Sequence, residues 1–152
     1  MTRRLEQSLT KLYHAYHNDL LEPECSCGCA VGNILNRTDA WKHLSDDHGS
    51  LHLNYVGKVH EALGRTFSGY KPSELLLIEK TFLEACGYQT PLRSNYKRPK
   101  NPTDKDLQFN GLCEVVSLLC AMDSVPDAMK LHSLFDRVDN TPKHALREVL
   151  YS

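Results

Sequence analysis

The sequence predicts an all-α protein: a small orthogonal helical bundle with a metal-stapled Cys/His loop and room for one short strand pair. Apolar residues recur every three or four positions along most of the chain. Prolines, glycines and capping residues divide it into about seven helical segments. No convincing hairpin dipeptide lies between alternating apolar runs. The length of 152 residues is that of one domain, so we expect a single helical domain over 1–152.

The first two predicted helices flank a cysteine-rich loop. An amphipathic stripe, ended by Pro23, comprises Leu5, Leu9, Leu12, Tyr16 and Leu20. The loop runs to about Thr38, which is expected to cap a short helix that contains Trp41 and stops near Gly49. This arrangement predicts a Cys/His zinc-binding segment at about 23–49, which includes the short helix.

Two further helices are expected in the middle of the chain. Residues 51–63 begin with an alternation typical of a strand and then take a helical spacing, so we predict mostly helix. Residues 73–86 follow Pro72, which suits a first helical position, and end at Gly87, which suits a C-terminal cap. The latter segment carries the clearest helical signal up to that point.

The C-terminal third is expected to hold a proline-rich loop and three helices. The loop covers 89–101. Thr103-x-x-Asp106 resembles a capping box that opens a helix reaching about Met122. Two shorter helices are predicted over 126–138 and 142–151, because each begins with proline.

The composition restricts the classes of partner and the compartment. The net charge of -1 gives no global attraction to nucleic acid or to an anionic membrane. No apolar run approaches the roughly 18 residues of a membrane span, and no apolar signal core follows the first arginines. These features favour a cytoplasmic protein without a membrane partner. In a reducing compartment, clustered cysteines indicate metal binding or redox chemistry rather than structural disulfides.

A metal-ligand spacing follows the first predicted helix. Cys25-x3-Cys29 is followed, after thirteen residues, by His43-x4-His48, which fits a tetrahedral site with two Cys and two His. Thiolates and imidazoles suit Zn(II), so the predicted cofactor is zinc, although iron stays open. Cys27 lies between the two thiolates and is either a substitute ligand or a spectator.

The two histidines need a helix end between them. Five residues apart on one helix, their side chains would point about 140° apart. Gly49 allows the helix to stop near Asp47, so that His48 can fold back across its C-terminus and Asp46 or Asp47 can accept the free ring N–H of a ligand histidine. Four protein ligands would close the site, and a closed site favours a structural metal over a catalytic one. If only three of them bound the metal, Asp46, Asp47 or Glu24 could serve as a general base near a bound water.

The stretches PECSCGCAVGN and DDHGSLHLNYVGKV resemble a group of small uncharacterised proteins of Bacteroidetes and their phages. Members often carry the label of a sodium-translocating NADH-quinone reductase component, which implies a ferredoxin-type iron–sulfur domain and a flavin domain. A plant-type cluster needs Cys-x4-Cys-x2-Cys, which Cys25, Cys27 and Cys29 do not match, and 152 residues could not also hold a flavin reductase. The resemblance therefore supplies no activity.

The functional hypothesis is a zinc-stabilised binding or adaptor protein rather than an enzyme. One alternative is a redox or iron–sulfur protein that uses the three clustered cysteines. Another is a phage or host-interaction protein. An unknown protein partner is expected in the first and last cases. Nucleic acid could bind only locally, through the basic residues Arg93, Lys97, Arg98 and Lys100.

Overall fold

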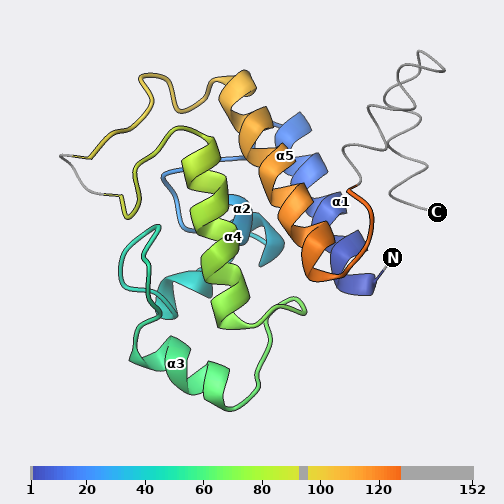
Figure 1. The fold of residues 1–152 in the computed structure, drawn as a ribbon. Coiled ribbons are helices and arrows are strands. Elements are labelled where there is room, and N and C mark those ends of the chain that lie inside the picture. Colours follow the sequence, from blue (N-terminus) through green and yellow to red (C-terminus); the bar gives the residue numbers. More distant parts are fainter. Residues whose placement is uncertain (1, 93–95, 128–152) are drawn as a thin grey trace.

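A computed structural model describes residues 2–92 and 96–127. The elements in chain order are α1 (Arg3–His17), α2 (Ala30–Ile34), the 3-10 helix η1 (Trp41–His43), α3 (Tyr55–Ala62), α4 (Pro72–Ala85) and α5 (Lys105–Met122) (Figure 1). This confirms the all-α prediction. Within the described residues, the only sign of a strand pair is an isolated bridge between Phe67 and Tyr70. The helices predicted over 126–138 and 142–151 lie almost entirely outside the described residues.

The core lies between the three long helices α1, α4 and α5. α5 packs against both α4 and α1, and α2 lies between α1 and α4 (Figure 1). α3 packs against α4 at the edge of this group. Fully buried apolar side chains from all three long helices meet in the core; they include Leu5, Leu12, Leu75, Ile78, Phe82, Val115 and Leu119. The central position of α4 explains why its residues can reach segments that are distant in sequence.

Two predicted helix boundaries are wrong, and local hydrogen bonds explain why. α1 ends at His17 rather than near Pro23, because Asp19 adopts a φ of +56° and the backbone N–H of Leu20 donates to the Ala15 carbonyl at 2.8 Å, which closes the last turn. α5 is capped by Asp104 and not by Thr103. The Asp104 carboxylate accepts from the backbone N–H of Asp106 at 2.8 Å.

The predicted loop over 23–38 contains a helix that the sequence did not indicate. All five residues of α2 are buried, so its sequence shows no polar face and no helical period. Thr38 does not cap the following turn, contrary to the prediction; its hydroxyl donates to the Leu35 carbonyl at 2.8 Å. The helix expected around Trp41 is present as the short turn η1.

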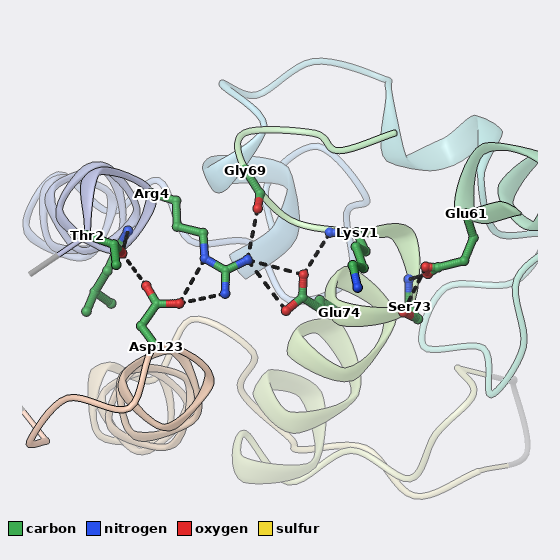
Figure 2. Close-up of polar contacts among 9 residues, drawn as sticks. Thr2, Arg4, Glu61, Gly69, Lys71, Ser73, Glu74 and Asp123 are labelled. Carbon is green, nitrogen blue, oxygen red and sulfur yellow. Dashed lines mark hydrogen bonds and ion pairs between the residues drawn. The ribbon is translucent and has the colours of Figure 1, made fainter. Parts of the chain in front are cut away.

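A polar junction fastens the ends of the long helices (Figure 2). Arg4 donates from Nη2 and Nε to Asp123 Oδ1, at 2.6 and 2.9 Å, and from Nη1 to the Gly69 carbonyl at 2.9 Å. The same Nη1 lies 3.2 Å from Glu74, near the start of α4. Thr2 also donates to Asp123. One arginine thus joins the start of α1, the end of α5 and the start of α4.

A second contact in the same view joins α3 to α4. The backbone N–H and the hydroxyl of Ser73 both donate to the Glu61 carboxylate, each at 3.1 Å (Figure 2). The carboxylate thereby satisfies a backbone donor in the first turn of α4, which has no partner within its own helix. The C-terminal half of α3 is therefore tied to the start of α4.

Candidate metal centre

A buried carboxylate stands in the middle of α4. Glu79 has no exposed surface, although its side chain is a carboxylate and the other buried residues around it on α4 are apolar. It follows Leu75 by four residues and precedes Phe82 by three, so the helical period places it on the same inward face. Sequence reasoning missed Glu79. A charged residue within an otherwise apolar helical stripe is the signal that could have found it, because a fully buried glutamate is rare unless it is paired.

Two donors from the segment after the cysteine loop hold the Glu79 carboxylate. Trp41 Nε1 donates to Oε2 at 2.5 Å, and the backbone N–H of Gly49 donates to Oε1 at 2.5 Å. Gly49 adopts a φ of +76°, and a β-carbon there would lie 2.9 Å from the Leu83 side chain. Only glycine fits this position without strain. The carboxylate therefore fixes both the Trp41 ring and the backbone next to His48.

His48 lies between a carbonyl and this carboxylate. Its Nε2 lies 2.6 Å from the Pro23 carbonyl, and its Nδ1 lies 3.2 Å from Glu79 Oε2. Burial lowers the pKa of His48, but contact with Glu79 and with the Pro23 carbonyl outweighs it, so the pKa is raised. We expected Asp46 or Asp47 to accept the free ring N–H. Both are exposed, and the Pro23 carbonyl occupies that position instead.

The third member is Cys29, which is the N-cap of α2 and is fully buried. Its Sγ lies 3.9 Å from Glu79 Oε2. Burial, followed by the negative charge of Glu79, raises the pKa of the thiol, against the opposing effect of the backbone N–H groups of Gly32 and Val31. Without a cation, Cys29 therefore keeps its proton at neutral pH.

Together these three residues form a donor group that could hold a metal ion. One ligand atom from each of Cys29, His48 and Glu79 lies within 4.8 Å of the other two. Sulfur, imidazole nitrogen and carboxylate oxygen are all ligands of Zn(II). His48 Nδ1 is buried and has no hydrogen bond of acceptable geometry among the described residues. An unsatisfied nitrogen that faces a carboxylate and a thiol fits the position of a metal ligand.

The remaining predicted ligands lie outside this group. His43 is exposed on η1, and its carbonyl accepts from Asn54 Nδ2 at 3.1 Å. Cys25 and Cys27 are half-buried and free, with their sulfur atoms 2.8 Å apart. A hydrogen bond with Cys25 and partial burial raise the pKa of Cys27. The structure thus brings together Cys29 and His48 of the predicted set and adds Glu79; the roles of Cys25 and His43 as ligands stay predictions.

The basic loop contacts the cysteine loop rather than standing alone. Arg98 Nη1 lies 2.8 Å from Glu24 Oε1, and the hydroxyl of Tyr88 donates to the other oxygen of Glu24 at 2.9 Å. Lys97 and Lys100 are exposed, and Arg93 lies outside the described residues. Local binding of nucleic acid through this loop stays a prediction. Among the described helices, none has the length and apolar character needed to cross a membrane.

No family model, no curated protein and no solved structure matches this chain. The resemblance noted from the sequence therefore stays a prediction.

Proposed function

We propose that this chain is a small cytoplasmic protein whose fold is stabilised by Zn(II) and whose role is to bind another protein. The observation that supports it is the group formed by Cys29, His48 and Glu79 around an unsatisfied imidazole nitrogen. These residues come from the cysteine loop, from the segment after η1 and from α4. An ion held by all three would bind the 23–50 segment to the centre of the core.

The argument for a cation is electrostatic. Nε2 of His48 faces a carbonyl, which can only accept a hydrogen bond, so Nε2 carries the proton of a neutral ring. The lone pair of Nδ1 then points at the Glu79 carboxylate. Two electron-pair donors at 3.2 Å in a buried site repel each other unless a positive charge lies between them. The charge can be a second proton on the imidazole or a metal ion. The additional presence of the Cys29 sulfur favours the metal.

The site is better suited to a structural role than to catalysis. Cys29 and Glu79 have no exposed surface, and the His48 side chain is 14% exposed. A substrate could not reach these atoms without displacing the surrounding core. The contacts of Glu79 with Trp41 and of His48 with the Pro23 carbonyl would orient the ligands, as hydrogen bonds behind the ligands commonly do in metal sites.

The binding role is supported by one surface. Large apolar side chains in the segment 51–63 remain exposed: Leu51 at 51%, Tyr55 at 81%, Val56 at 46%, Val59 at 38% and Leu63 at 61%. Contiguous exposed apolar groups are typical of interaction sites. Gly57 is the one buried residue of α3, so this helix contributes its apolar side chains mainly to the surface rather than to the core.

The metal is tested by elemental analysis of protein purified without chelator, with about one zinc per chain expected. Cys29→Ser should lose the metal, because a neutral hydroxyl does not replace a thiolate. Cys86→Ser is the matched control, since Cys86 is also fully buried but lies outside the donor group. Cys25→Ser and His43→Ala separate the proposed group from the four-ligand set predicted by spacing. A colourless protein without stoichiometric metal would refute the proposal, and a brown one with iron would favour the iron–sulfur alternative.

The binding role is tested by affinity capture from native lysate with matched surface variants. Tyr55→Ser together with Leu63→Ser should abolish recovery of a stoichiometric partner, whereas Lys97→Ser together with Lys100→Ser should leave it unchanged. The reverse result would show that the partner contacts the basic loop instead of the segment 51–63. That outcome would favour the local nucleic-acid or host-interaction alternatives.

A further inference from the structure

We propose that Cys25 and Cys27 are a redox-active dithiol, which exchanges with small disulfides such as oxidised glutathione and cycles between two thiols and one intramolecular disulfide. This site is separate from the zinc group and does not rest on it. The observation that supports it is the distance of 2.8 Å between the two sulfur atoms, both half-buried and therefore accessible from solvent.

The backbone holds the two thiols in place. Residues 22–29 close on themselves through four hydrogen bonds: the N–H of Glu22 to the Gly28 carbonyl at 2.7 Å, that of Cys25 to Glu22 at 3.0 Å, and those of Gly28 and Cys29 to Cys25 at 3.1 and 2.9 Å. The cysteine loop therefore forms a compact turn. Within this turn the two sulfur atoms lie 2.8 Å apart.

The adjacent helix limits the freedom of this turn further. A β-carbon on Gly32 would lie 2.2 Å from the carbonyl carbon of Cys27 and 2.6 Å from the Ser26 oxygen. The turn therefore packs directly against the backbone of α2 at Gly32, where a side chain would clash with it. A thiol pair held in this way loses little conformational freedom when it forms a disulfide, which favours the intramolecular product.

Cys29 is not expected to take part in the exchange. Its sulfur has no exposed surface and lies beside Glu79 in the core, whereas the attacking thiolate must reach a disulfide in solvent. The cysteine loop therefore carries two kinds of thiol. Cys25 and Cys27 face the surface, and Cys29 faces the core.

The exchange balances without any further reagent. The thiolate of one cysteine of the pair attacks a sulfur of oxidised glutathione, and one glutathione thiolate leaves and takes up a proton. The second cysteine then loses its proton and attacks the mixed disulfide, and it expels the other glutathione. The pair loses two electrons and two protons in total, and oxidised glutathione becomes two molecules of reduced glutathione.

The test uses the full chain with an excess of oxidised glutathione, followed by acid quenching, alkylation of remaining thiols and mass spectrometry. Wild type should carry neither glutathione nor an alkyl group on Cys25 or Cys27 and should yield a peptide that contains a Cys25–Cys27 disulfide; an adduct on the half-buried Cys113 does not bear on the pair. Cys25→Ser and Cys27→Ser should each stop at a stable adduct with one glutathione, because the second thiol is missing. Cys113→Ser, which removes another half-buried thiol, should behave like wild type.

Three results would overturn the proposal: a persistent glutathione adduct on Cys25 or Cys27 of wild type, a disulfide that includes Cys29, or serine variants that take up no glutathione on the remaining cysteine of the pair. The zinc content of the same samples is measured in parallel. Absence of zinc with formation of the Cys25–Cys27 disulfide would refute the proposed metal function and leave the dithiol intact. Retention of zinc after oxidation would show that the Cys25 thiolate is not a required ligand.

Discussion

Replacing Glu79 by glutamine removes one negative charge from the centre of the core and leaves the size of the side chain almost unchanged. The two Glu79 oxygens accept from Trp41 Nε1 and from the Gly49 N–H, each at 2.5 Å. In the variant, one of these donors faces an amide NH2 and loses its partner. A buried donor without a partner costs about 1 to 3 kcal/mol, and this is the loss expected in the absence of metal.

The contribution of the proposed zinc would add to that loss and can be separated from it. A metal present at a thousand times its dissociation constant stabilises the folded state by about 4 kcal/mol. For a chain of this size, each kcal/mol corresponds to about 2 to 4 °C in Tm. Chelation of wild type should therefore lower the Tm by about 8 to 16 °C, whereas chelation of Glu79→Gln should change it little.

Thermal unfolding of wild type and of Glu79→Gln, each with and without a zinc chelator, distinguishes the lost hydrogen bond from the lost metal. Glu84→Gln is the matched control, because it makes the same change on the same helix at an exposed position. It should retain the chelator-dependent shift of wild type. If Glu79→Gln kept the full chelator-dependent shift, Glu79 would not be a ligand. If chelation did not change the Tm of wild type, the positive charge beside His48 would be a proton on the imidazole and not a metal ion.

Two further perturbations test parts of the fold. Burial raises the pKa of Asp123, but hydrogen bonds from Arg4 and Thr2 outweigh it and lower the pKa. The stabilisation by Asp123 is present above the unfolded pKa of about 3.9 and is lost as the pH falls through the lower folded value. Urea unfolding from pH 6 to pH 2 should show this loss in wild type and a weaker pH dependence in Asp123→Asn. Gly49→Ala should destabilise the folded protein more than Gly64→Ala does, and it should lose the proposed zinc. Both glycines have positive φ, but of these two only Gly49 has a neighbour that an added β-carbon would contact. Calorimetry and metal analysis of the two variants check this.

The long helices could be predicted because their apolar period is strong and their breakers are clear. α4 begins at Pro72, as the sequence indicated, and ends at Ala85 next to the predicted end. α2 could not be predicted in the same way, since a five-residue helix that is buried all round has no polar face to reveal its period. Its position is decided by tertiary packing between α1 and α4.

The candidate site could be predicted only in part, because spacing along the chain reports local chelation and not distant contacts. Cys29 and His48 were found from their place in a Cys/His pattern, and they do lie together. Glu79 comes 31 residues after His48 along the chain, and only the packing of α4 brings it there. Cys25 and His43 satisfy the same spacing rule, yet they lie outside the group in the structure, since a rule on spacing does not specify which thiol faces the core.

The buried donor group also determines how the exposed apolar surface is held. η1 has three residues, and an isolated helix shorter than about 12 residues is marginal, so the segment 41–50 depends on its contacts with Glu79. Asn54 caps α3 and also binds this segment, through its N–H to the Leu44 carbonyl at 3.0 Å and its Nδ2 to the His43 carbonyl. The start of α3 is thus attached to residues whose position the donor group fixes. A metal at Cys29, His48 and Glu79 would therefore order the exposed apolar surface on α3 from a distance, which is the physical reason why the proposed structural ion and the proposed binding role support each other.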